Sequence, residues 1–231
     1  MVRLLLWFVA VFVVMQVLSA VPVLGRLFHI PFLGFMLAAV VVGFLGERLS
    51  RRLVSGRRLR SLERSLGGVD TPHNQGKLGA LLVSQGRHRR ALVPLERAIA
   101  GEPDVPEWHY RAGVALLGLG RAREAATELE RAAELDEEYG FGSVLMRLAE
   151  AKAKQGEDEA VLATLARFER NHGPNPESAY RLARALRRLG RKDQAPAAFT
   201  EVLELAGSSV RYQRGASFGW ALRARLQRLV L

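Results

Sequence analysis

The sequence contains no cysteine among its 231 residues. Disulfide bonds, thiolate metal sites and cysteine nucleophiles are therefore excluded. Its five histidines are scattered, and no two have the i, i+4 spacing of a ligand pair on one helix, so we expect no zinc site and no other cofactor. A nucleophile–base motif, a Gly-rich phosphate loop after a strand and a carboxylate pair placed in a cleft are also missing. We therefore expect a protein that is not an enzyme.

Acidic residues are absent from residues 205–231, which carry five Arg. Residues 47–66 hold seven Arg and only two Glu, whereas residues 67–204 are close to neutral, so the net charge of +11 lies on two flanks. A nucleic-acid-binding protein more often carries its basic stripe on the folded domain itself. We therefore expect no nucleic acid as a partner.

Two long apolar runs precede the first basic flank. As helices, residues 4–24 would reach roughly 31 Å and residues 28–45 roughly 27 Å, close to the thickness of a bilayer core. The link between them, around Gly25 and Arg26, is short. The pattern predicts a transmembrane hairpin over residues 1–46 with both ends on the same side.

The basic residues after the second run predict the side. An excess of Lys and Arg marks the cytoplasmic side of a membrane, so we expect a two-span protein of the inner membrane whose N-terminus and following domain are cytoplasmic. Residues 47–68 are expected to form an Arg-rich stalk against the lipid bilayer. The side chains expected to contact the membrane surface are Arg48, Arg51, Arg52, Arg57, Arg58 and Arg60. The alternative is that residues 1–20 are a cleaved signal peptide, which would place the following domain outside the cytoplasm.

The stretch from His73 to Glu137 holds one pattern twice, 34 residues apart. Seven positions recur, six of them with the same residue type: Leu78, Gly79, Leu82, Gly86, Ala91, Leu95 and Ala98 return as Ala112, Gly113, Leu116, Gly120, Ala125, Leu129 and Ala132. In each unit the first Gly is expected to let two helices pack closely. The second is expected to end a helix and to allow a tight turn. A period of 34 with small residues at fixed offsets is typical of the tetratricopeptide repeat, a helix–turn–helix unit.

Residues 72–206 thus resemble tetratricopeptide repeat proteins. The third unit is degraded, with Ala149 where the first two have Gly, and about two residues are inserted before it near Tyr139–Ser143. The fourth unit recovers the register. The expected units are about 72–105, 106–139, 142–174 and 176–207.

The fold class that we expect is all-α. A two-helix transmembrane hairpin is followed by an α-solenoid of about four repeats over residues 69–208, and a basic amphipathic capping helix over residues 209–231 ends the chain. This layout is similar to that of bacterial membrane-anchored proteins with a divergent array of such repeats.

The resemblance implies a concave groove, lined by the first helix of each unit, that binds other proteins. Carried onto this sequence, the groove positions include Ala80 and, as the expected partner-binding residues, His73, Val83, Tyr110, Val114, Leu117, Met146, Glu150, Lys154, Tyr180, Arg184, Arg187 and Arg188. The groove would change from apolar to basic along its length. We expect it to hold an extended peptide with an acidic end, because the fork of an Arg side chain can donate two parallel bonds to a carboxylate. The alternative is that the Arg cluster of the fourth unit is a solvated face.

The function expected from these features is a membrane-anchored, non-catalytic scaffold for protein–protein interaction at the cytoplasmic membrane face. The alternative is an accessory subunit of a membrane enzyme or biogenesis complex, acting in delivery or assembly.

Overall fold

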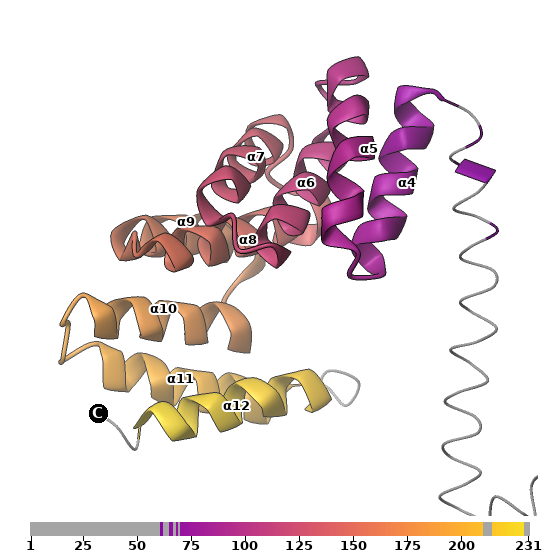
Figure 1. Ribbon diagram of the computed structural model, residues 1–231. Helices are drawn as coiled ribbons and strands as arrows, with labels where there is room; N and C mark the ends of the chain where they lie inside the picture. Colours follow the sequence, from indigo (N-terminus) through magenta and orange to yellow (C-terminus); the bar gives the residue numbers. More distant parts are fainter. Residues whose placement is uncertain (1–60, 62–64, 67, 69, 210–213, 229–231) are drawn as a thin grey trace, which may run out of the picture. The chain divides into compact units, whose positions relative to one another are not determined.

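The computed structural model describes residues 61, 65, 66, 68, 70–209 and 214–228. The chain divides into two compact units, Met1–Arg64 and Ser65–Leu231. Nearly all described residues belong to the second unit, and they form nine α-helices (Figure 1). The helices are α4 Pro72–Ser84, α5 His88–Gly101, α6 Pro106–Gly118, α7 Ala122–Leu135, α8 Tyr139–Gln155, α9 Asp158–His172, α10 Pro176–Arg188, α11 Ala195–Ser208 and α12 Arg214–Arg228.

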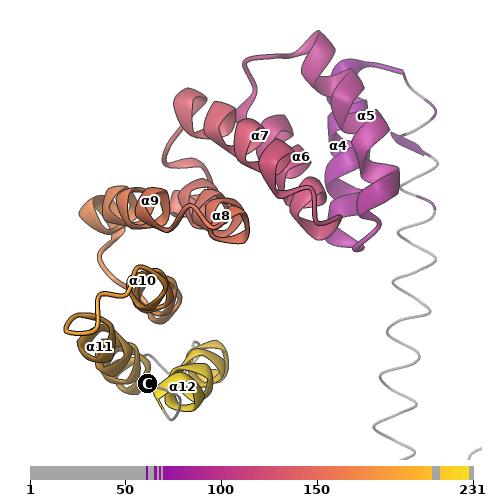
Figure 2. The same cartoon turned by 60° about the vertical axis from the view of Figure 1, so that its left-hand side comes forward.

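The first eight helices pack as four hairpins, α4 with α5, α6 with α7, α8 with α9, and α10 with α11. The second helix of each of the first three hairpins packs on the next hairpin, and the first helices of consecutive hairpins also touch one another. Figure 2 shows α8, α10 and α12 on one side of this stack and α9 and α11 on the other. The described part of the chain is therefore an α-solenoid with a row of first helices and a row of second helices.

The predicted transmembrane hairpin requires a correction. The described helices have 13 to 17 residues, fewer than the ~20 apolar residues that a membrane span needs. Among them, none combines the length and apolar character of a membrane span. The fold class is therefore corrected to an all-α solenoid of nine described helices. The predicted hairpin of residues 1–46, with spans 4–24 and 28–45, lies outside the described residues, as does most of the stalk.

The predicted location is corrected by the same finding. A two-span protein of the inner membrane, with the repeats on either side, would need membrane-spanning helices, and no described helix provides one.

Proline begins three of the first helices, α4, α6 and α10, and a capping side chain precedes α4 and α10. Pro72 lies in the first turn of α4, where its missing N–H costs no helical hydrogen bond. The hydroxyl of Thr71 accepts a bond from the backbone N–H of Asn74 at 3.3 Å. Asn175 caps α10 in a reciprocal capping box with Ser178. These local signals set the entry of α4 and α10 before any tertiary contact is considered.

The repeated glycines have the two roles that the sequence predicts. A Cβ at Gly79 would lie 2.4 Å from Cγ of Leu95, and one at Gly113 would lie 2.5 Å from Cγ of Leu129, so any side chain there would separate the two helices of a hairpin. Gly86, which follows α4, has φ of +71°, a left-handed conformation that most other residues adopt only with strain.

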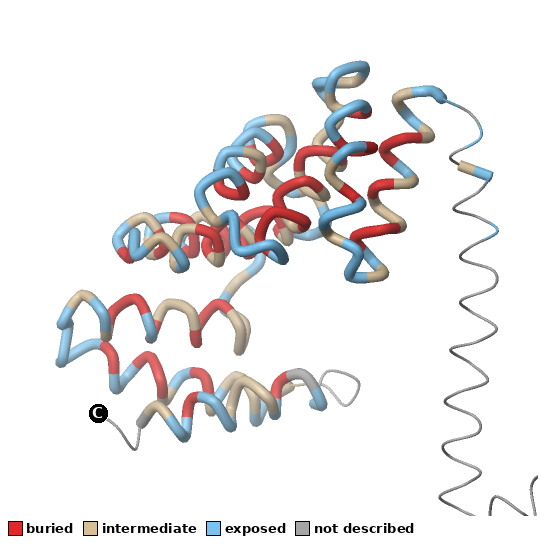
Figure 3. The backbone as a smooth tube through the Cα atoms, in the orientation of Figure 1, coloured by how far each residue is buried: buried red, intermediate tan, exposed pale blue. Residues whose placement is uncertain are grey.

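The core runs between the helices as a series of apolar clusters. Figure 3 marks the buried residues in red along the helices. Leu95 and Leu129, on α5 and α7, are fully buried. Trp108 is only 2% exposed and packs on Gly76 of α4, where a Cβ would lie 2.6 Å from its ring. Its indole Nε1 donates to the Glu102 carboxylate at 2.9 Å. This tryptophan therefore packs in the core between α4 and α6.

The start of α8 is distorted where the sequence indicates an insertion. Gly140, Phe141 and Gly142 have left-handed backbone conformations with φ of 63°, 57° and 71°. The Phe141 side chain is 90% exposed. A Cβ at Gly142 would meet His172 at 2.6 Å, which explains why the chain passes α9 at a glycine.

Helix α12 packs on both α10 and α11, in the position that the first helix of a further hairpin would take. Trp220 packs against Tyr180 with ring centroids 5.4 Å apart, and Ala224 is fully buried. Three apolar side chains at i, i+4 and i+8 remain exposed on this helix, Phe218, Leu222 and Leu226.

Candidate functional site

All twelve expected partner-binding residues lie on α4, α6, α8 and α10, whose shared surface we call the first-helix face. Four of them, Val83, Leu117, Met146 and Tyr180, are buried, with 6–8% of their surface exposed. These four side chains form the packed floor beneath the face. The other eight are at least partly exposed, namely His73, Tyr110, Val114, Glu150, Lys154, Arg184, Arg187 and Arg188.

Aromatic contacts hold the apolar end of the first-helix face. The ring of His73 lies edge-on to Trp108, with centroids 5.6 Å apart. Tyr110 packs against Tyr139 with centroids 5.3 Å apart, and the guanidinium of Arg111 lies 5.6 Å from the centre of the Tyr110 ring. These side chains tie each first helix to the next, so the structure uses them for packing in the unbound chain.

Glu150 is the centre of an ion-pair network between α8 and α10. Arg147 donates to its Oε2 at 2.6 Å, and Arg181 donates to the same oxygen at 3.1 Å. Nζ of Lys154 lies 3.7 Å from the other oxygen. Arg181 also donates to Glu177 at 2.7 Å. Glu150 and Lys154 therefore already have partners within the array.

The network changes the protonation of Glu150. Burial raises the pKa of this carboxyl, but the positive charges of Arg181 and Arg147 and the hydrogen bond from Arg147 outweigh that effect and hold the pKa below its usual value. The carboxylate is thus ionised, and it serves as a counter-ion to the cations around it.

The basic end of the first-helix face surrounds a small cavity. Its volume is about 30 Å³, and it is lined by Ala153, Asp158, Arg181, Arg184, Ala185 and Arg188. Arg188 donates from Nη1 to the Ala153 carbonyl at 2.8 Å and to Asp158 at 3.2 Å. Arg184 is exposed, with its guanidinium 6.0 Å from the centre of the Tyr180 ring. The structure thus brings Arg184 and Arg188 to one cavity, while Arg187 does not line it.

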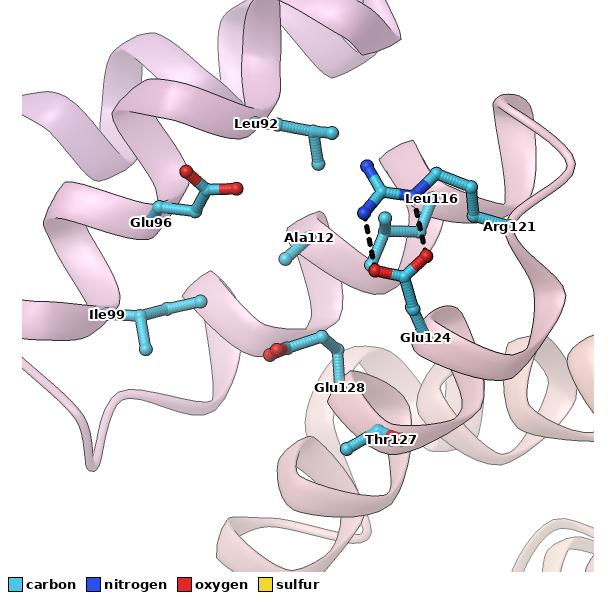
Figure 4. A pocket seen from close by; sticks show the side chains of 9 residues that line it. All are labelled: Leu92, Glu96, Ile99, Ala112, Leu116, Arg121, Glu124, Thr127 and Glu128. Atoms are coloured by element: carbon cyan, nitrogen blue, oxygen red, sulfur yellow. Dashed lines mark hydrogen bonds and ion pairs between the residues drawn. The ribbon is translucent and has the colours of Figure 1, made fainter.

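A larger hollow lies between α5 and α7, and sequence reasoning missed it. We call it the second-helix pocket (Figure 4). Its volume is about 220 Å³, and its lining residues are Leu92, Glu96, Ile99, Ala112, Leu116, Arg121, Glu124, Thr127 and Glu128. The α6 side chains Ala112 and Leu116 contribute apolar surface beneath the gap. The pocket draws on three helices, so no single stretch of sequence signals it.

The charged rim of the second-helix pocket is unevenly paired. Arg121 forms a two-bond pair with Glu124, in which Nε donates to Oε1 at 2.7 Å and Nη2 donates to Oε2. Those hydrogen bonds hold the pKa of the Glu124 carboxyl below its usual value. Glu128 Oε2 lies 2.8 Å from Nδ1 of His109. Glu96 is exposed and forms no ion pair with the residues that the structure describes.

The remaining expected contact residues lie outside what the structure describes. The six Arg expected at the membrane surface, Arg48, Arg51, Arg52, Arg57, Arg58 and Arg60, lie outside the described residues. Within residues 70–209 and 214–228, no group of three or more His, Asp or Glu side chains is arranged to hold a metal ion.

Two family models, both described as tetratricopeptide repeat, match this sequence. One covers residues 82–139 and the other residues 146–210, together more than half of the chain. The chain belongs to the tetratricopeptide repeat proteins. Members of this family are generally non-catalytic scaffolds that bind protein or peptide partners, and this chain has the fold of such a scaffold.

Solved structures of this family share the fold at low sequence identity. A structure of MamA (MSR-1) superposes with a TM-score of 0.60 at 20% identity, over 68% of this chain and 91% of that one. YrrB is described as a tetratricopeptide repeat protein with an unusual peptide-binding site. Its structure superposes with a TM-score of 0.53 at 18% identity, over 72% of this chain and 83% of YrrB. A thermophilic tetratricopeptide repeat protein from Thermus thermophilus superposes with a TM-score of 0.51 at 21% identity, over 74% of this chain and 96% of that one. No curated protein sequence matches the chain.

Proposed function

We propose that this scaffold binds an extended peptide of a partner protein along its first-helix face, and that Arg184 and Arg188 hold an acidic residue or a terminal carboxylate of that peptide. The observation that supports the proposal is the small cavity between α8, α9 and α10, which is lined by three Arg and one Asp. Arg181 is paired with Glu150 and Glu177 and Arg188 with Asp158, so the charge of Arg184 is the one without an ion-pair partner among the described residues. The peptide-binding site described for YrrB supports a peptide as the class of ligand.

The two arginines would contribute differently. Arg184 forms no ion pair with the described residues and is exposed, so its whole guanidinium is open to a carboxylate. Arg188 uses Nη1 for Ala153 and Asp158, which leaves the N–H groups of Nε and Nη2 for a ligand. Since Asp158 already holds Arg188 in place, little side-chain entropy is lost when a carboxylate binds.

A displayed library of random 12-residue peptides tests the proposal. We expect the full chain to enrich peptides with an Asp, a Glu or a free carboxyl terminus near one end. Binding of the enriched peptides should fall about tenfold or more in Arg184→Glu, because a favourable charge pair becomes a repulsive one. Arg123→Glu, an exposed arginine on α7, is the matched control. Equal binding by the Arg184→Glu and Arg123→Glu variants would contradict the proposal.

A further inference from the structure

The second-helix pocket has the size of an anchor site. Its volume of about 220 Å³ is below the ~300–1,000 Å³ of pockets that enclose a cofactor or a drug-sized ligand. Protein interfaces, in contrast, are commonly held by one or a few large side chains that enter small pockets. The dimensions therefore favour one side chain of a partner over a free small molecule.

The lining selects the kind of side chain. Apolar surface comes from Leu92 and Ile99 of α5 and from Ala112 and Leu116 of α6. The rim carries three Glu and one Arg. Glu124 is paired with Arg121 and Glu128 with His109, so Glu96 is the carboxylate that has no ion-pair partner among the described residues. Long basic side chains combine an aliphatic stem with a charged head, and they commonly place the stem on apolar surface while the head stays near water.

Two carboxylates on the rim have capacity for a cation. In Figure 4 the carboxylates of Glu96 and Glu128 project from opposite sides into the space between α5 and α7. Glu96 forms no ion pair with the described residues, and only Oε2 of Glu128 is engaged, with His109. Glu124 is neutralised because both of its oxygens accept from Arg121.

We propose that the second-helix pocket binds an Arg side chain from a basic, apolar segment of a partner protein. The stem of that Arg packs on Leu92, Ile99 and Leu116, and its guanidinium lies between Glu96 and Glu128. An Arg fits better than a Lys, because its planar fork can donate to two carboxylates at once.

This site is separate from the Arg-lined cavity of the first-helix face. It uses the other row of helices and selects the opposite charge, so either proposal can fail without the other. A chain with both sites would bridge an acidic segment and a basic segment, which is the task of a scaffold.

The experiment uses the full chain and a fluorescein-labelled peptide of three Ala-Leu-Arg-Leu repeats. The control peptide replaces each Arg with citrulline, which keeps the shape and removes the charge. We expect the Arg peptide to bind at least fivefold more tightly in fluorescence anisotropy, with an affinity that falls as salt is added. Glu96→Gln should weaken binding about fivefold, the range of an exposed charge pair. Thr127→Trp, which fills the mouth of the pocket, should remove binding.

Glu204→Gln is the matched control, since Glu204 is an exposed glutamate on another second helix, α11. Glu96 and Thr127 are both exposed, so their substitutions leave the core intact, which circular dichroism checks. Three results overturn the proposal: no binding of the Arg peptide, equal binding of the citrulline peptide, or equal affinity in Glu96→Gln and Glu204→Gln.

Discussion

Nδ1 of His109 on α6 lies 2.8 Å from Oε2 of Glu128 on α7. The other ring nitrogen of His109 lies 2.9 Å from the carbonyl oxygen of Pro103, so both nitrogens face an acceptor. Both contacts are hydrogen bonds when each nitrogen carries a proton, or when the Glu128 carboxyl is protonated. His109 is only 6% exposed. This buried ring therefore fastens the two helices of the second hairpin to the loop before them, next to the second-helix pocket.

Removing this ring should destabilise the array. In His109→Ala both acceptors lose a buried partner, and we expect the free energy of unfolding to fall by about 1–3 kcal/mol. Glu128→Gln keeps the shape and should cost less. Urea unfolding followed by circular dichroism gives both values, with Arg123→Ala on the exposed side of α7 as the control. A loss for His109→Ala no larger than that of the control would show that the two contacts contribute nothing.

The Glu150 network predicts a loss of stability in acid. The folded chain holds the pKa of Glu150 below its usual value, so the stabilisation is present above the ordinary glutamate pKa of about 4.3 and is lost as the pH falls through the folded value. The difference in free energy of unfolding between the wild-type chain and Glu150→Gln should therefore be large at pH 7 and shrink below about pH 4. Urea unfolding over this range measures it, with Glu204→Gln as the control. A difference that stays constant with pH would exclude this role.

The sequence predicts the helices well because their signals are local. Small residues 34 positions apart, proline in the first turns and glycine after the helices specify hairpins without any knowledge of their neighbours. The distortion at Phe141 is also visible in the sequence, as an insertion that breaks the period. Apolar length predicts the transmembrane hairpin, and no helix in the described part of the chain is long and apolar enough to span a membrane.

The site is less predictable, because the pattern within a helix shows which face a residue occupies but not which side chain lies opposite. Glu150 is an expected groove residue and Arg181 is not, and only the packing of α8 on α10 joins them at 3.1 Å. Likewise, Leu92, Leu116 and Glu128 meet in one pocket although they come from three helices. Four expected groove residues are buried for the same reason, since neighbouring first helices pack on them.

The glycine that each of the first two hairpins places between its helices should be irreplaceable. In Gly79→Ala the new Cβ would lie 2.4 Å from Cγ of the fully buried Leu95, and we expect a loss of about 1–3 kcal/mol from overpacking. Gly219→Ala is the matched control. A Cβ at Gly219, inside α12, meets nothing within 4 Å, so this change should stabilise the chain by about 0.5–1 kcal/mol. Thermal unfolding measures the melting temperature of both variants. Melting temperatures that shift in the same direction for Gly79→Ala and Gly219→Ala would contradict this prediction.

Phe141 should be a site where substitution stabilises the fold. Its φ of 57° is left-handed, a conformation that costs a bulky residue about 1–3 kcal/mol, and its side chain is 90% exposed and so gives little packing in return. Phe141→Gly removes this strain but makes the unfolded chain more flexible by about 0.5–1 kcal/mol. We therefore expect a net gain of about 0.5–1 kcal/mol in urea unfolding. Phe141→Val loses the same exposed ring but keeps the strain, because a β-branched residue is disfavoured at positive φ, so it should give no gain. Equal stability of the Gly and Val variants would show that the backbone at this position is not strained.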